Sequence, residues 1–193
     1  MSTLAMQVSP PRVRTRTAYR LALALAGSWL IAGLAQLEAH LPFTPVPVTG
    51  QTLGVLLVAA SLGPRLGGAS IALYLVQGAA GLPFFAGGTS GWDVLTLGSV
   101  TGGYLWGFAV AAAVVGSLAE RGWDRDLRRA ATAMLVGEVA IYAIAIPWLM
   151  VAADLPIGRA FALGMAPFLV GDLVKLVAAA ALLPTAWRVA GRR

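Results

Sequence analysis

Long apolar stretches separated by short connections are the feature that most limits how this chain folds. A transmembrane helix needs roughly 20 mostly apolar residues, and the chain of 193 residues is 59% hydrophobic and only 11% charged. At this length, six crossings leave no room for a separate soluble domain. We therefore predict an all-α integral membrane protein with six transmembrane helices. The predicted helices lie at about residues 18–37, 51–63, 66–82, 101–119, 128–153 and 160–187.

The basic residues are distributed unevenly along the chain. Lys and Arg gather on the cytoplasmic side of membrane proteins, and six crossings place both termini on one side. With both termini in the cytoplasm, twelve of the fourteen basic residues are cytoplasmic, Arg159 is outside and Lys175 is within the membrane. We therefore predict a multi-pass protein of the cell membrane, with a cytoplasmic tail at 1–17, one membrane domain at 18–187 and a basic cytoplasmic tail at 188–193. This arrangement accounts for the net charge of +6, so we expect contact with the lipid bilayer and no nucleic-acid partner.

Several kinds of catalytic or metal site are excluded by composition. The chain has no Cys and a single His, His40, which rules out thiolate metal sites, Cys nucleophiles and an HExxH zinc site. Its single Lys, Lys175, lies in an apolar segment and does not follow a Gly-x-x-x-x-Gly sequence, so the chain has no P-loop. We expect no metal, no cofactor and no enzymatic activity, and any ATP-driven transport needs an ATPase from another protein.

Two predicted outer loops have unusual compositions. The first, residues 41–50, contains Pro42, Pro45 and Pro47, which fix an extended backbone. The segment after it is too short to cross the membrane alone, so the loop either dips inward as a lid over a cavity or forms a rigid outer loop. The second loop, 81–91, is rich in Gly and includes Phe84 and Phe85. Together with Trp92 and Tyr104, these aromatic residues offer flat apolar walls for a pocket.

Two opposite charges lie in the sixth predicted segment. Asp172 and Lys175 are near its middle, where each charge costs roughly 2.5–3.5 kcal/mol to insert. The i, i+3 spacing places them on one helical face. They form either a buried ion pair with no further role or a binding site. An Asp acceptor beside a Lys donor suits a neutral ligand group that has both N–H and C=O, such as a cyclic urea or amide.

Two further features leave alternatives open. Glu138, one helical turn before Tyr142, is either a site residue or a partner of Arg128 or Arg129 near the cytoplasmic interface. In the first segment, small residues recur at intervals of four and allow another helix to approach closely. This face serves either packing within the chain or docking of a partner membrane subunit, and its residues are Ala18, Ala22 and Ala26.

Taken together, these segments resemble the BioY family, the biotin-binding substrate (S) components of energy-coupling factor (ECF) transporters. The resemblance covers nearly the whole chain after about residue 18. It is carried by PFTPVPVTGQT from Pro42, GLPFFAGGTSG from Gly81, TGGYLWGF from Thr101, IPWL from Ile146 and PFLVGDLVK ending in Lys175.

The resemblance implies a six-helix protein that binds biotin in an outward-facing pocket covered by the loops after the first and third helices. Asp172 and Lys175 match the family's Asp-x-x-Lys and would hydrogen-bond the ureido ring. Other matched positions near the pocket are Thr49, Gly87, Gly88, Thr89 and Tyr104, and we add Phe84 to the predicted binding residues as an apolar wall. No Arg or Lys lies in the loop at 87–90, so no residue is assigned to the biotin carboxylate.

The resemblance also implies partners and a mechanism of uptake. The S component topples in the membrane on a membrane-embedded coupling (T) subunit, driven by two ABC-type ATPases. The face formed by Ala18, Ala22 and Ala26 would be the docking surface for the coupling subunit.

Other functional classes make different predictions. An ion-coupled or solitary vitamin carrier would take up a proton on Asp172 or Glu138, and an S component for another vitamin would show competition between vitamins. An intramembrane enzyme would use one of these acids as a general base. The enzyme lacks support because the chain has no second His, no Cys and no Gly-x-Ser-x-Gly.

Overall fold

The computed structural model of the chain describes residues 3–4 and 13–190. The predicted tails at 1–17 and 188–193 therefore lie partly outside the described residues, and with them Arg12, Arg192 and Arg193. Within the described part, five helices are long and apolar enough to cross a membrane. These are α2 (Val13–Ala35), α3 (Gln51–Ala79), α4 (Gly102–Glu120), α5 (Leu127–Ala152) and α7 (Leu169–Ala190).

Helix α3 joins two of the six predicted segments, and this explains why five long helices appear. At Gly63 the backbone leaves the helical region, with φ 79° and ψ 178°. Glycine adopts this conformation without the Cβ clash that other residues meet, and Pro64 follows it. The two halves fold back on each other, since Gln51 Nε2 donates to Tyr74 Oη at 2.5 Å, whereas a straight helix would separate these residues by about 34 Å. The segments predicted at 51–63 and 66–82 are therefore the two arms of one helical hairpin.

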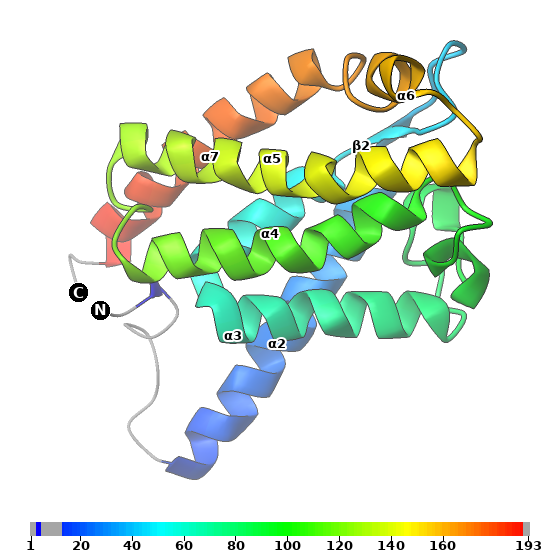
Figure 1. The fold of residues 1–193 in the computed structure, drawn as a ribbon. Helices are drawn as coiled ribbons and strands as arrows, with labels where there is room; N and C mark the ends of the chain where they lie inside the picture. Colours follow the sequence, from blue (N-terminus) through cyan, green and yellow to red (C-terminus); the bar gives the residue numbers. More distant parts are fainter. Residues whose placement is uncertain (1–2, 5–12, 191–193) are drawn as a thin grey trace.

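The bundle has two ends with different contents. At one end, Gly116 of α4 packs against the Gly63–Pro64 turn, and Trp187 Nε1 donates to Asp124 Oδ2 at 2.5 Å. We call this the basic end, because it includes the Arg-rich connection at 121–126. The opposite end, the loop end, carries the long connections and the short helix α6 (Ile157–Gly164) (Figure 1).

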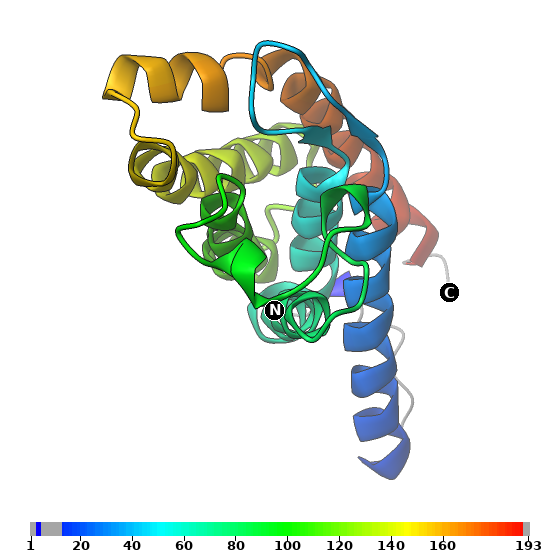
Figure 2. The ribbon, with the colours of Figure 1, turned by 90° about the vertical axis from the view of Figure 1, so that its right-hand side faces the viewer.

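Helix α2 stands apart from the rest of the bundle over part of its length. Its N-terminal half projects beyond the other helices in both views (Figures 1 and 2). Further along, Gly27 approaches Ser70 of α3 closely, and Ser28 Oγ donates to Gln77 Oε1 at 3.0 Å. One face of α2 therefore packs on the second half of α3, while its N-terminal turns remain uncovered.

The sixth predicted segment, 160–187, is interrupted. Helix α6 ends at Gly164, a turn occupies residues 165–168, and α7 begins at Leu169. Pro167 lies in this turn, and a proline disfavours helical geometry in the residue before it. Asp172 consequently lies in the first turn of α7 and not near the middle of a continuous span, as the sequence predicted. A carboxylate is favoured at this position by the helix dipole.

The proline-rich connection forms the tip of a small hairpin. Strand β1 (Glu38–Ala39) pairs antiparallel with β2 (Val48–Thr49), with Glu38 opposite Thr49. Thr44 Oγ1 donates to the Leu163 carbonyl at 2.6 Å, which ties the loop to α6. The Gly-rich connection is also ordered, with the 3-10 turns η1 (Ala86–Gly88) and η2 (Trp92–Leu95). Both loops are thereby fixed over the same end of the bundle.

Candidate ligand-binding cavity

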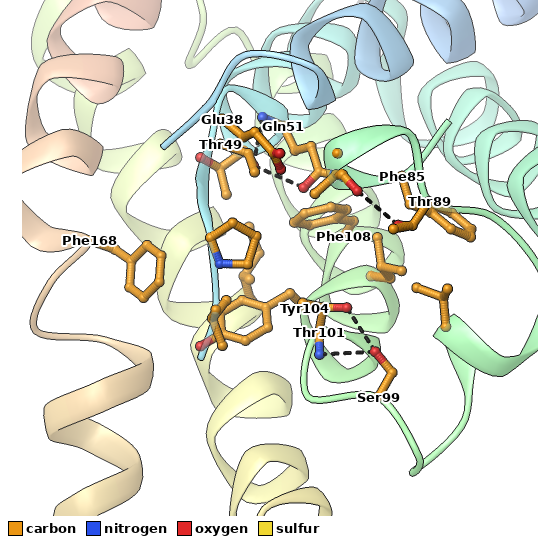
Figure 3. A pocket seen from close by; sticks show the side chains of 18 of the residues that line it. Glu38, Thr49, Gln51, Phe85, Thr89, Ser99, Thr101, Tyr104, Phe108 and Phe168 are labelled. Atoms are coloured by element: carbon orange, nitrogen blue, oxygen red, sulfur yellow. Dashed lines mark hydrogen bonds between the residues drawn. The ribbon is translucent and has the colours of Figure 1, made fainter. Parts of the chain in front are cut away.

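A cavity of about 410 Å³ lies at the loop end of the bundle, within the range of small-molecule sites. Its wall combines side chains of α3, α4, α5 and α7 with residues of both loops. The proline-rich hairpin contributes Val46 and Pro47, and the Gly-rich loop contributes Phe85 and Gly87. Figure 3 shows labelled residues of α3, α4, both loops and the turn before α7 around one space. The cavity therefore depends on segments far apart in the sequence.

One part of the wall is a charged cluster that joins three helices. Lys175 Nζ lies 3.0 Å from Asp172 Oδ1 and donates to Thr52 Oγ1 of α3 at 3.1 Å. Tyr142 of α5 donates its hydroxyl to Asp172 Oδ2. We call Thr52, Tyr142, Asp172 and Lys175 the ion-pair group. Because both carboxylate oxygens and two of the three ammonium hydrogens are engaged, the geometry of the charged groups is fixed before any ligand enters.

Aromatic rings form the middle of the wall. Tyr104 lies with its ring centroid 6.2 Å from Phe168 and 6.4 Å from Tyr142, and its hydroxyl donates to the Gly164 carbonyl at 2.5 Å. Phe85 and Phe108 also line the cavity, and Figure 3 shows Phe168 across from Tyr104. These rings form an apolar section of the wall, in which the Tyr104 hydroxyl is held by the last residue of α6.

A second polar cluster lies among the loops. We call its members the rim group: Glu38, His40, Thr89, Ser99 and Thr101, all of which line the cavity. The Ser99 and Thr101 hydroxyls lie 2.9 Å apart, so one of their two hydrogens is free to donate elsewhere. His40 Nδ1 lies 3.7 Å from Glu38 Oε1, and the His40 side chain is 74% exposed. The rim group is thus a mixture of hydroxyl groups and one long contact between His40 and Glu38 near solvent.

The structure brings most of the predicted site residues to the cavity. Its lining includes six of them: Thr49, Gly87, Thr89, Tyr104, Asp172 and Lys175. Gly88 and Phe84 are not part of the lining. Phe84 is buried instead between Trp29 and Tyr74, with ring centroids 5.4 Å and 6.3 Å away, and the adjacent Phe85 faces the cavity. What each lining residue does remains a prediction.

Glu138 also lies in the cavity wall. The sequence allowed two positions for Glu138: in the binding site, or beside Arg128 or Arg129 near the cytoplasmic interface. Those arginines are exposed at the start of α5, about 14 Å away along the helix, and no ion pair joins them to Glu138 in the described structure. The i, i+4 spacing to Tyr142 placed both side chains on one face of α5, and this was the signal in the sequence. Thr52, Ser99, Thr101 and Phe168 carried no such signal and were not predicted.

The predicted docking face of α2 is open. Ala18, Ala22 and Ala26 are exposed, whereas Ala24 and Ile31 on other faces of the helix are buried. In the described part of the chain, these three alanines are therefore not buried against another segment. As for metals, the described residues contain no cluster of three or more His, Asp or Glu that would hold an ion.

Comparison with known proteins gives consistent matches. The sequence profile of the BioY family matches residues 6–192. A biotin transporter BioY of Rhizobium etli is 38% identical over 149 residues, which cover 74% of this chain and 78% of the relative. A biotin transporter BioY of Thermotoga maritima is 36% identical over 159 residues, covering 82% and 86%.

The fold has a counterpart among solved structures. The crystal structure of the S-component for biotin from an ECF-type ABC transporter aligns with a TM-score of 0.81 at 19% sequence identity. The alignment covers 92% of this chain and 95% of that chain. At this identity the match shows that the two chains share a fold.

Proposed function

The chain belongs to the BioY family, and we propose that it binds biotin in the cavity and mediates biotin uptake as the S component of an ECF-type transporter. Membership in this family confirms the prediction of a multi-pass membrane transport protein rather than an enzyme. The observation that carries the proposal is the ion pair between buried Asp172 and partly buried Lys175 in the wall of the cavity. A buried ion pair is often no more stabilising than apolar packing, so its presence there favours a role in binding.

The ureido ring of biotin matches the ion-pair group. The ring is neutral and presents N–H donors beside a C=O acceptor. Asp172 accepts from an N–H, and the third hydrogen of the Lys175 ammonium is directed at the carbonyl. Hydrogen bonds to charged groups contribute roughly 1.5–3 kcal/mol each. Because Tyr142 and Thr52 already hold the two charged groups, little ordering is needed when biotin binds.

The rest of the ligand follows the cavity toward the loops. The apolar valeryl chain passes the aromatic rings of Tyr104 and Phe168. Its carboxylate then reaches the rim group, where Ser99 and Thr101 supply a hydroxyl donor and His40 supplies a positive charge when protonated. This orientation places the neutral ring in the buried part of the cavity and the charged end near solvent, as the cost of burying a charge requires.

Titration of the purified chain in detergent tests the proposal. Biotin should bind saturably by calorimetry, and neither riboflavin nor thiamine should compete, since neither has a carbonyl flanked by two ring N–H groups. Displacement of biotin by another vitamin would indicate an S component of different specificity. Proton-dependent uptake by the purified chain alone, in vesicles, would instead support an ion-coupled carrier.

We further propose that both arms of α3 cross the membrane, the short first arm together with the proline-rich loop that precedes it. The six crossings then place the basic end in the cytoplasm and the loops outside, in agreement with the positive-inside rule. Since the chain has no Cys, single cysteines at Ser90 and Arg121, both exposed, can be labelled without background. A membrane-impermeant thiol reagent should modify Ser90→Cys in intact cells and spare Arg121→Cys until the membrane is opened.

For energy coupling, we propose that the exposed alanine face of α2 docks a membrane-embedded coupling subunit that works with two ABC-type ATPases. Small residues at this spacing let two helices approach closely. Ala22→Leu should therefore leave biotin binding unchanged and reduce uptake when the coupling subunits are present. Ala109→Leu, at an exposed position of α4, is the matched control and should affect neither. Equal loss of binding and uptake in Ala22→Leu would contradict the docking role.

A further inference from the structure

Glu138 is a buried carboxylate without a partner. Its side chain is 4% exposed, and neither oxygen accepts a hydrogen bond from any described residue. Asp172, the other buried acid of the cavity wall, has both oxygens engaged by Lys175 and Tyr142. Leaving a buried acceptor unpaired is costly. Since the protein does not satisfy Glu138 itself, the cavity is the place from which a donor can come.

The position of Glu138 relative to the ion-pair group is set by two helices. Glu138 precedes Tyr142 by one turn of α5, and the two side chains share a face. Lys175 follows Asp172 by about one turn of α7, which runs antiparallel to α5. Tyr142 meets Asp172 across the gap, so Glu138 lies at about the level of Lys175. In the described structure Glu138 and Lys175 nevertheless form no ion pair, although both line the cavity.

The wall of the cavity thus presents two carboxylates and one ammonium. A cyclic urea presents two N–H donors flanking one C=O acceptor. Asp172 and Lys175 account for one N–H and the carbonyl, which leaves the second N–H without an acceptor. We propose that Glu138 accepts the second ureido N–H and is the third polar contact that selects a cyclic urea. This inference rests on the proposed binding of biotin and adds a specificity-determining residue to it.

Two substitutions and a control separate this role from a structural one. Glu138→Leu removes the acceptor, and Glu138→Gln keeps an oxygen but removes the charge. We expect biotin affinity to fall about 100-fold in the first and about 10-fold in the second. Glu120→Gln makes the same chemical change at the end of α4, outside the cavity, and should bind biotin like the wild type. Because Glu138 has no internal partner, neither Glu138 variant should lower the unfolding temperature of the ligand-free protein.

Biotin analogues methylated on one ureido nitrogen identify the contact itself. One of the two N-methyl isomers lacks the N–H that Glu138 accepts. The affinity of this isomer for Glu138→Leu should be less than about 3-fold below its affinity for the wild type. The other isomer should lose about as much as biotin does. Equal losses for both isomers, or a lowered unfolding temperature in both variants, would overturn the inference. If the wild type binds biotin and Glu138→Leu binds it equally well, this inference alone fails; if the wild type binds no biotin, the proposed function fails.

Discussion

Replacing Lys175 by Met separates the stabilising and ligand-binding roles of the ion-pair group. Met has a similar length without the charge, so Asp172 would remain buried and lose its cation. The two side chains are only 15% and 9% exposed, and removing one partner of such a pair costs about 3–5 kcal/mol. Because the hydrogen bond from Tyr142 to Asp172 remains, we expect the lower end of this range. At about 2–4 °C per kcal/mol, the unfolding temperature should fall by about 6–12 °C.

The double variant Asp172→Leu/Lys175→Met completes the test. Apolar residues of similar volume often replace a buried ion pair without loss of stability, so most of the lost unfolding temperature should return. Biotin binding should be absent in both variants, since the double variant restores packing but not the donor and acceptor. Thermal unfolding and calorimetric titration in the same detergent measure the two properties. A double variant as unstable as the single one, or biotin binding retained in either, would refute the reasoning.

Three further changes test individual contacts. Tyr142→Phe removes the hydrogen bond to Asp172 and should weaken biotin binding about 5- to 10-fold by calorimetry, whereas unchanged affinity would show that Asp172 needs no second partner. Ser99→Ala should weaken binding of biotin more than binding of its neutral amide, because a hydrogen bond to a charged group is the stronger one, and equal effects on the two ligands would contradict a carboxylate contact there. At the basic end, burial raises the pKa of Asp124 despite the opposing hydrogen bond from Trp187, so ionised Asp124 lowers stability at neutral pH. Asp124→Asn should unfold at a higher temperature than the wild type at pH 7, with an advantage that disappears below about pH 3.8, the ordinary pKa; an advantage independent of pH would contradict this cause.

The sequence predicted the helical membrane architecture because apolar segment length is a local property. It did not predict that Gly63 and Pro64 would join two segments as one bent helix, or that Pro167 would interrupt the sixth segment. Both are breaks of a single turn within apolar stretches, where hydropathy stays high. The consequence for the site was an error in the position of Asp172, which begins α7 instead of lying midway along a span.

The candidate site was predicted best where spacing along one helix carried the information. Asp172 and Lys175, three residues apart, form the ion pair that this spacing indicated. Contacts between distant segments were not predictable, such as the bond from Lys175 to Thr52, 123 positions away. Phe84 was predicted to line the cavity, but the adjacent Phe85 does so instead. The cause is similar, because Phe84 packs against Trp29, a residue distant in the sequence.

Biotin titration of the purified chain and of Asp172→Asn tests the central claim most directly. The substitution keeps the shape of the side chain and removes its charge, and Asp93→Asn, exposed and outside the cavity, makes the same change as a control. We predict saturable binding by the wild type and by Asp93→Asn, with affinity at least about 10-fold lower in Asp172→Asn. Equal affinity in all three folded proteins would contradict the assignment of the ion-pair group as the biotin site.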